Sequence, residues 1–269
     1  MVDITISIVL FQTDKEELRH LLSLINESPL SKHIYLIDNS TNDDLRIFSN
    51  TPNVEYIFNY VNVGYGAGHN VAIGKAQNMS KYHIIMNSDI DFNPIILEQA
   101  FICMETNDNI GMISPKILLP DGELQHFCRK LPTPFDLFAR RFVPGFAKPL
   151  FKRFLDNYLL LNKDYSSTMN IPNLPGCFMF VRTAILVEVG GFDENFFLYV
   201  EDIDLTRRLH EKSVTLYYPN IVVRHSLARG SYKDIKLVLH HIASAIYYFN
   251  KWGWFNDKGR ITINKNLTH

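Results

Sequence analysis

Residues 4–25 read ITISIVLFQTDKEELRHLLSLI and combine the signals of a strand with those of a helix. Ile4 to Leu10 is rich in β-branched side chains, which predicts a buried β-strand. Asp14 is a typical helix-capping residue, and apolar residues recur at helical spacing after it. These residues are Leu18, Leu21, Leu22 and Ile25. A strand followed at once by an amphipathic helix is the first half of a βαβ unit.

The same alternation of strand and helix continues along the N-terminal part of the chain. We expect further strands at 33–37, 54–58 and 82–86, and further helices at 67–77 and after Pro94. This order is typical of an α/β fold with a mostly parallel, Rossmann-like sheet flanked by helices. Ligands of such sheets bind beyond the carboxyl ends of the strands, where this chain has polar clusters. The clusters are Asp38-Asn39-Ser40, Asn62 to Asn70 and Asn87 to Asp91.

Composition excludes several classes of protein. The chain has 269 residues, of which 46% are hydrophobic and 20% charged, so a sizeable core is available and disorder is excluded. A formal net charge of −1 argues against nucleic acid as a partner. Cys103, Cys128 and Cys177 are far apart and form no zinc or disulfide pattern. With no signal peptide and no membrane-spanning run, we expect a cytoplasmic protein.

The second half of the chain is less regular. Residues 113–127, with Asp121-Gly122 in the middle, predict a hairpin. Residues 132–175 are rich in Pro and Phe and have no clear period. Regularity returns with an expected strand at 177–181, a helix near 202–211, short strands over 214–223 around Pro219, and a terminal helix at 234–251.

The glycine cluster Gly64-Tyr65-Gly66-Ala67-Gly68 is not a dinucleotide-binding motif. A GxGxxG pattern starting at Gly64 or Gly66 requires glycine at position 69 or 71, where the chain has His69 and Val71. Two interpretations remain open. The cluster is either a flexible turn leading into a helix or a loop whose backbone closely approaches a ligand, with the Asn62 and Asn70 amides as hydrogen-bond partners.

Two acidic segments have both a functional and a structural interpretation. Asn87-Ser88-Asp89-Ile90-Asp91 ends a strand in oxygen ligands that suit Mg²⁺ or Mn²⁺, but an Asx turn explains the same residues. Glu201-Asp202-Ile203-Asp204 places three carboxylates in one helical turn. Such crowding raises a carboxyl pKa towards general-base use, whereas the alternative is a solvated helix start favoured by the helix dipole. The apolar and aromatic residues 196–200 argue for partial burial of this turn.

The order of these motifs resembles the family 2 inverting glycosyltransferases, most closely the bacterial rhamnosyltransferase-like branch. The motifs are Asp38-Asn39-Ser40, Asn62 to Asn70, Asn87-Ser88-Asp89, Gly190 to Glu194, and Glu201 to Arg208, and the resemblance spans Ile4 to His225. It implies a GT-A fold with a small mixed acceptor-side subregion. The expected domain is 1–228, with a nucleotide-sugar-binding half at 1–115 and an acceptor half at 116–228. Residues 229–269 are expected to form a C-terminal helical tail.

The resemblance also implies the roles of individual residues. Asp202 is the expected general base, with Glu201 second, and Asp89 is the expected ligand of Mg²⁺ or Mn²⁺, with His225 completing that site and Asp91 as second choice. Leu10, Phe11, Gln12 and Asp38 are expected to line the base and ribose pocket. The other expected nucleotide-sugar contacts are Asn39, Asn62, Gly64, Tyr65, Gly66, Asn70, Asn87 and Ser88. The residues expected on the acceptor or donor-sugar side are Gly176, Cys177, Arg208 and Arg229.

The favoured donor by resemblance is dTDP-rhamnose, with galactosyl or galactofuranosyl transfer from a UDP-sugar as the alternative. The expected acceptor is a lipid-linked glycan of a bacterial surface polysaccharide. A nucleotidyltransferase is disfavoured because residues 11–14 (FQTD) provide no glycine-rich basic phosphate loop. A non-catalytic nucleotide-sugar-binding module is disfavoured because Glu201 and Asp202 are both present.

Residues 135–158 (FDLFARRFVPGFAKPLFKRFLDNY) interleave basic and aromatic side chains. This composition suits an anionic membrane surface, which would place the protein peripherally on the inner face of the cytoplasmic membrane. A lid on the acceptor side explains the segment equally well. The terminal helix, which ends near Trp252 and Trp254, is interpreted as a surface for a homodimer or a second membrane contact.

Overall fold

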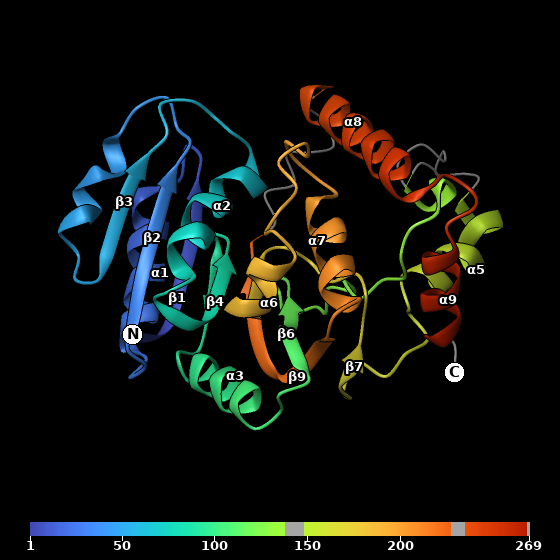
Figure 1. The fold of residues 1–269 in the computed structure, drawn as a ribbon, viewed down its shortest axis with the longest axis horizontal. Helices are drawn as coiled ribbons and strands as arrows, with labels where there is room; N and C mark the ends of the chain where they lie inside the picture. The colour runs from blue at the N-terminus through green and yellow to red at the C-terminus, as the bar shows by residue number, and fades with distance from the viewer. Residues whose placement is uncertain (138–147, 227–234, 268–269) are drawn as a thin grey trace.

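The computed structural model describes residues 1–137, 148–226 and 235–267, without the side chains of 148–150. Its centre is a nine-stranded mixed sheet with the order β3-β2-β1-β4-β8-β6-β9-β5, and β7 pairs with β9 (Figure 1). The strands are β1 (Val2–Leu10), β2 (Lys32–Asp38), β3 (Val54–Phe58), β4 (Ser80–Met86), β5 (Ile90–Phe92), β6 (Ile110–Leu118), β7 (Met169–Asn170), β8 (Phe178–Arg182) and β9 (Val214–His225). The expected α/β class is confirmed, with the first four strands all parallel.

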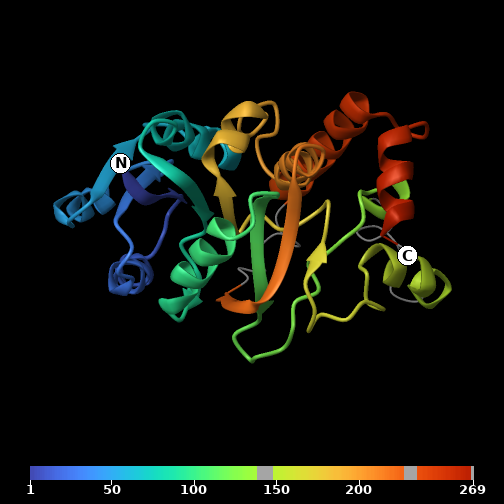
Figure 2. The ribbon, with the colours of Figure 1, turned by 60° about the horizontal axis from the view of Figure 1, so that its bottom comes forward.

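Helices cover both faces of the sheet, as Figure 2 shows. One face carries α1 (Lys15–Glu27), α3 (Ile95–Glu105) and the 3-10 helix η1 (Asp44–Asn50). The other carries α2 (Tyr65–Ala76), α6 (Thr183–Glu188) and α7 (Glu201–His210). Because alternate residues of a strand point to opposite faces, Ile4, Ile6, Ile8 and Leu10 of β1 pack in the cluster that contains the apolar residues of α1 and α3.

Helix α1 begins as the sequence predicts. The Asp14 carboxylate accepts hydrogen bonds from the backbone N–H groups of Glu16 and Glu17, which satisfies two donors of the first turn. The predicted apolar stripe Leu18, Leu21, Leu22 and Ile25 is buried. Local sequence signals therefore determine both the start of this helix and the face that it turns to the core.

The register of the sheet brings several strand ends to one edge. Leu10 at the end of β1 pairs with Asp38 at the end of β2, and Met86 at the end of β4 pairs with Phe178 at the start of β8. His225, the last residue of β9, pairs with Ile90 of β5. The polar clusters that follow these strands therefore lie along the same edge, as expected for a ligand site of an α/β sheet.

Strand β9 differs from the short strands expected around Pro219. It is continuous from Val214 to His225, and its register against β6 shifts where the pairing moves from Pro115–Tyr218 to Lys116–Val222. Proline lacks an N–H for the ladder, so the irregularity absorbs it without ending the strand. The expected hairpin at 113–127 is confirmed as a tight turn, closed by the Leu119 N–H donating to the Glu123 carbonyl, with one bridge beyond it.

The C-terminal tail packs on the main domain through two helices, α8 (Ile235–Trp252) and α9 (Lys258–Asn266), and α9 was not expected from the sequence. Ala245, Tyr248 and Phe249 of α8 form one apolar cluster with Phe196, Val200, Ile203 and Leu137. This face of α8 is thus used within the chain, and the homodimer stays a prediction. In the described ranges no helix combines the length and the apolar character needed to cross a bilayer.

Candidate active site

The ends of β1 and β2 form the first part of the site. Asp38 is fully buried, and its carboxylate accepts hydrogen bonds from the Ser40 N–H at 2.8 Å and the Tyr56 hydroxyl at 2.6 Å. The Ser40 hydroxyl in turn accepts from the Gln12 N–H, and the Asn39 N–H donates to the Leu10 carbonyl. Each oxygen of Asp38 accepts only one of these bonds and keeps a lone pair for another donor. The expected contact of Asp38 with the base or ribose stays a prediction. Phe11 beside this edge is half exposed.

The glycine loop approaches the chain itself. Gly64 has φ +93°, and a Cβ there would lie 2.4 Å from the Phe197 carbonyl oxygen. A Cβ on Gly66 would lie 2.8 Å from Cβ of Phe192. The expected close approach to a ligand is therefore, in this structure, a close approach to residues 192–197. Asn62 accepts a hydrogen bond from the Gly64 N–H and so shapes the turn.

The side chain of Asn70 is hydrogen-bonded within the protein. Its amide oxygen accepts from the Phe192 N–H, and its amide nitrogen donates to the Phe192 carbonyl and to Glu194. These contacts connect α2 to the loop that leads to α7. The expected nucleotide-sugar contact by Asn70 receives no support from this geometry.

Asp89 and His225 meet at the carboxyl ends of β4 and β9. His225 Nε2 lies 3.2 Å from Asp89 Oδ1 and 3.4 Å from the Asn87 amide nitrogen. Burial lowers the pKa of His225, but hydrogen bonds to Asp89 and Cys177 outweigh burial and raise that pKa to about 10. The adjacent Ser88 hydroxyl donates to Glu17 of α1. Asp89 therefore faces a buried, protonated imidazole.

The Asp89 carboxylate fits a hard divalent cation shared with a substrate, and His225 would join it as a neutral imidazole, because a protonated ring has no lone pair for a metal. His225 Nε2 is the ring nitrogen that faces Asp89, at 3.2 Å, and so is the atom that would join the cation. A group of three or more His, Cys, Asp or Glu that could hold a metal is absent from the described part of the chain. That finding is compatible with Mg²⁺, which typically takes one or two protein carboxylates and completes its shell with phosphates and water.

Asp91, the second choice for a metal ligand, lies in other surroundings. Its side chain is 47% exposed, 3.1 Å from His20 Nε2 and 3.8 Å from Arg224 Nη1. Alternation along β5 turns it away from the residue pair that contains His225. The geometry thus favours Asp89 over Asp91.

Glu201 and Asp202 are the first two residues of α7, which lies on the same face of the sheet as α2 and α6. Glu201 is 6% exposed, and its Oε2 is buried without a hydrogen-bond partner among the described residues. Burial raises the pKa of both carboxyl groups, and the neighbouring Asp202 raises that of Glu201 further. A solvated helix start is therefore excluded. Asp202 is the more exposed of the two carboxylates.

A short series of contacts joins this acidic pair to the strand ends. The Gly176 N–H donates to Asp202 Oδ2 at 3.3 Å, and the Gly176 carbonyl lies 2.8 Å from the Tyr65 hydroxyl. The Tyr65 hydroxyl also lies 2.9 Å from Asn87 Oδ1, and Asn87 contacts His225. The Asn87 N–H donates to the Cys177 carbonyl. The structure therefore gathers Tyr65, Asn87, Gly176 and Cys177 at one site between Asp202 and the Asp89–His225 pair.

Two arginines predicted on the sugar side have different outcomes. The Arg208 guanidinium binds Asp204 at 2.8 Å and the carbonyls of Val189 and Gly191 at 2.6 and 2.8 Å, so it braces α7 against the preceding turn. It is not brought to the acidic pair. Arg229 lies outside the described residues.

Arg129 lies near Asp202 in the fold and was not predicted from the sequence. Its positive charge lowers the pKa of Asp202, which places the guanidinium within electrostatic reach of that carboxylate. The segment is held by the Arg129 N–H, which donates to the Asn173 carbonyl. A single arginine in an irregular stretch carries no sequence signal that distinguishes it from a surface residue.

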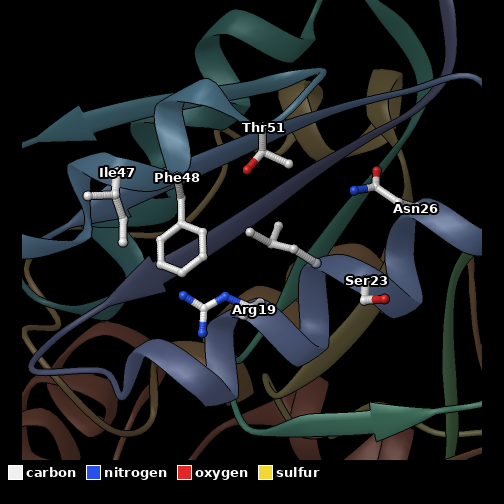
Figure 3. A pocket seen from close by; sticks show the side chains of 7 residues that line it. Arg19, Ser23, Asn26, Ile47, Phe48 and Thr51 are labelled. Atoms are coloured by element: carbon white, nitrogen blue, oxygen red, sulfur yellow. The ribbon is translucent and has the colours of Figure 1, made fainter.

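A separate pocket of about 390 Å³ lies between α1 and η1 (Figure 3). Arg19 from α1 lies opposite Phe48 and Ile47 from η1, and Thr51 closes one side. The guanidinium carbon of Arg19 is 5.7 Å from the Phe48 ring centre. None of the residues expected in the site lines this pocket, so it is distinct from the edge that carries the acidic pair.

Sequence comparison finds relatives over most of the chain. It is 27% identical over 263 residues to an N-acetylglucosaminyl-diphospho-decaprenol L-rhamnosyltransferase from Mycobacterium tuberculosis, covering 91% of this chain and 83% of that one. It is 28% identical over 224 residues to the rhamnosyltransferase WbbL from Escherichia coli K12, covering 78% of each. Comparison with models of known protein families finds none that matches.

Comparison of structures supports the same fold. The crystal structure of GalNAc-T7 with UDP, GalNAc and Mn²⁺ superimposes with a TM-score of 0.66 at 16% identity. The match covers 96% of this chain but only 49% of that one, so this chain spans about half the length of that protein. The resemblance and the GT-A fold expected from the sequence motifs are confirmed.

Proposed function

We propose that this chain, a transferase with the GT-A fold of glycosyltransferases, moves a rhamnosyl group from dTDP-rhamnose to a hydroxyl of a lipid-linked glycan, with inversion at the anomeric carbon. The observation that carries this proposal is the contact series from Asp202 through Gly176, Tyr65 and Asn87 to His225 and Asp89. This series supports a base and a charge-neutralising group acting at one edge of the sheet. The names of the relatives, which include a decaprenol-linked acceptor, support the donor sugar and the acceptor class.

The chemistry follows from the two ends of this site. The acceptor oxygen forms a bond to the anomeric carbon as the bond from that carbon to the diphosphate oxygen breaks. Asp202 receives the acceptor proton, and a carboxyl pKa raised by burial strengthens it as a base. Attack from the face opposite the leaving group inverts the anomeric centre, and no covalent sugar–enzyme bond is required.

The leaving diphosphate carries the developing negative charge. The protonated His225 lies at the Asp89 end of the site, where a cation stabilises that charge. Asp89, together with the neutral form of His225, would hold Mg²⁺ or Mn²⁺, which when bound would supply this positive charge in place of the imidazolium. The Tyr65 hydroxyl contacts both the Gly176 carbonyl and Asn87, and so holds the backbone between Asp202 and the Asp89–His225 pair.

We also propose an anionic membrane surface as a partner, because a lipid-linked acceptor lies there. Helix α5 (Lys148–Tyr158) exposes Lys152 and Arg153 beside Phe154, which is 40% exposed. Arg140 and Arg141, expected in the same patch, lie outside the described residues. Co-sedimentation with vesicles containing anionic lipid tests this: Lys152→Glu with Arg153→Glu should lower binding, and Lys75→Glu with Lys212→Glu should not. Equal vesicle binding by both double variants would show that Lys152 and Arg153 do not bind an anionic membrane.

A donor panel tests the proposed reaction directly. Purified chain, Mg²⁺ or Mn²⁺ and a polyprenyl-diphosphate-linked glycan are incubated with dTDP-rhamnose, UDP-galactose or UDP-galactofuranose, and nucleotide release and the glycolipid mass are followed. We expect acceptor-dependent dTDP release with a mass gain of one deoxyhexose. Transfer from a UDP-sugar alone would replace the donor, and binding of a nucleotide sugar without any transfer would favour a non-catalytic module.

A further inference from the structure

The backbone enters α7 in an unusual conformation. Tyr199 and Val200, the two residues before Glu201, have φ angles of 66° and 70°. Side chains other than glycine disfavour this left-handed region, and a β-branched valine disfavours it most. Such geometry persists only where the surroundings hold it, and it is concentrated at functional sites. The direction in which the acidic pair enters the site therefore depends on whatever holds these two residues.

Helix α8 supplies the contacts around this entry. The His240 ring stacks on Phe197 at 4.5 Å, and the His241 ring lies 5.6 Å from Tyr199. Between them, the Ser244 hydroxyl donates a hydrogen bond of 2.8 Å to the Leu198 carbonyl. That carbonyl belongs to the peptide that joins Leu198 to Tyr199. The hydrogen bond therefore restrains the rotation that places Tyr199 in the left-handed region.

The contacts continue along α8 towards its C-terminus. Lys251 binds both Asp193 at 2.7 Å and Asp204 at 2.9 Å, and the Trp252 indole N–H donates to Asp204 at 2.7 Å. Asp204 is fully buried and lies in the same helical turn as the acidic pair. Helix α8 therefore contacts the entry loop and the first turn of α7 together.

We propose that α8 positions the acidic pair and that Ser244 is the positioning residue that sets the entry into α7. This inference rests on the proposed function, since it concerns the base of that reaction. Ser244 is 4% exposed and touches neither Glu201 nor Asp202 in the described contacts. Its effect passes through the Leu198 peptide to the two carboxylates that follow.

The experiment compares Ser244→Ala with Ser213→Ala. Ser213 makes the same kind of bond, hydroxyl to backbone carbonyl at 3.0 Å, but to Leu209 near the other end of α7. For each purified variant, kcat and KM for the donor, the thermal midpoint, and deuterium exchange of peptides covering 196–203 are measured. We expect Ser244→Ala to lower kcat about tenfold with donor KM nearly unchanged, because a small displacement of a catalytic group is costly. We also expect faster exchange over 196–203.

Ser213→Ala should leave kcat within about twofold of the parent. The inference is overturned if Ser244→Ala keeps the parent kcat and exchange pattern, or if both variants lose kcat equally. The exchange measurement separates this inference from the proposed function. Absence of transfer by the parent chain, together with faster exchange in Ser244→Ala, would reject the reaction while supporting the positioning of the loop by α8.

Discussion

The guanidinium of Arg207 and the carboxylate of Asp257 form a buried two-point contact, with Nη1–Oδ2 at 2.6 Å and Nη2–Oδ1 at 2.8 Å. Arg207 also stacks over the Trp252 ring at 3.7 Å. Because Asp257 caps α9 by accepting from the Arg260 N–H, the pair ties the C-terminal helices to α7. The tail is therefore part of the structure that supports the acidic pair.

Replacing Asp257 by alanine should destabilise the fold strongly. The substitution leaves the Arg207 charge buried without its partner, which typically costs about 3–5 kcal/mol of unfolding free energy. Urea unfolding monitored by tryptophan fluorescence measures this change. Glu188→Ala, which breaks the exposed pair with Lys212, is the control and should shift the urea midpoint little. Similar midpoints for the two variants would show that the tail does not stabilise α7.

Two buried histidines should make the fold sensitive to acid. His69 and His83 are joined through the Ser7 hydroxyl, at 2.7 and 2.9 Å, and Thr5 binds the other nitrogen of His83. Burial lowers the pKa of His83 to about 3. The pKa of His69 is lowered well below its usual value, first by burial and then by the repulsion that His83 would exert if both rings were protonated. Both rings are therefore neutral in the folded chain at neutral pH.

The sign of the pH dependence follows from these lowered values. Unfolded histidine binds a proton with a pKa near 6.5, so below that pH the unfolded state binds more protons and stability falls, by up to about 2.7 kcal/mol per pH unit for two groups. Urea midpoints between pH 5 and pH 8 measure the slope. His83→Gln should reduce the part of the slope that comes from the two histidines by about half. Glu201 and Asp202, whose pKa values are raised, contribute equally to the parent and the variant, so their contribution cancels when the two slopes are subtracted. An unchanged slope would contradict a neutral His83.

Asp89 and Asp91 should differ sharply in activity assays. Asp89→Ala removes the carboxylate that would hold the divalent cation and should lower transfer by about a hundredfold or more, because the positive charge that stabilises the leaving diphosphate would be lost with the metal. Asp91→Ala removes an exposed partner of His20 and Arg224 and should retain most of the activity. Excess chelator should reproduce the Asp89→Ala loss. The reverse order of the two variants would move the expected metal ligand to Asp91.

Gly64 and Gly74 should respond in opposite ways to alanine. Gly64 has φ +93°, and an added Cβ would meet the Phe197 carbonyl at 2.4 Å, so Gly64→Ala should destabilise the fold and displace the loop before α7. Gly74 lies within α2 with no atom near an added Cβ, and Gly74→Ala should stabilise by about 0.5–1 kcal/mol. Thermal midpoints measure both. A stabilising Gly64→Ala would contradict the close contact of this loop with Phe197.

Local patterns predicted much of the fold. The cap at Asp14, the β-branched run of β1 and the polar ends of β2 and β4 are each signalled by neighbouring residues, so the sequence alone predicted them. The motif order singled out Asp89, Glu201 and Asp202, and their roles stay predictions. The continuity of β9 across Pro219 was not predicted, because pairing with β6 decides it.

Other parts of the site depend on contacts between distant segments. Arg129 lies near Asp202 only in the folded chain, and the contact of Ser244 with Leu198 joins residues 46 positions apart. Asn70 and Arg208 belong to the motifs, but their side chains hold protein backbone rather than facing the acidic pair. Sequence spacing identifies polar residues near a site and does not distinguish ligand contacts from structural ones.

Asp202→Asn tests whether Asp202 is the base that takes the acceptor proton. The substitution keeps the shape of the side chain and removes its capacity to take the acceptor proton. With the donor and acceptor of the proposed reaction, we expect sugar transfer to fall by at least about a hundredfold. Binding of the nucleotide diphosphate, measured by calorimetry, should be unchanged. Near-parent turnover by Asp202→Asn would show that Asp202 is not the base of this reaction.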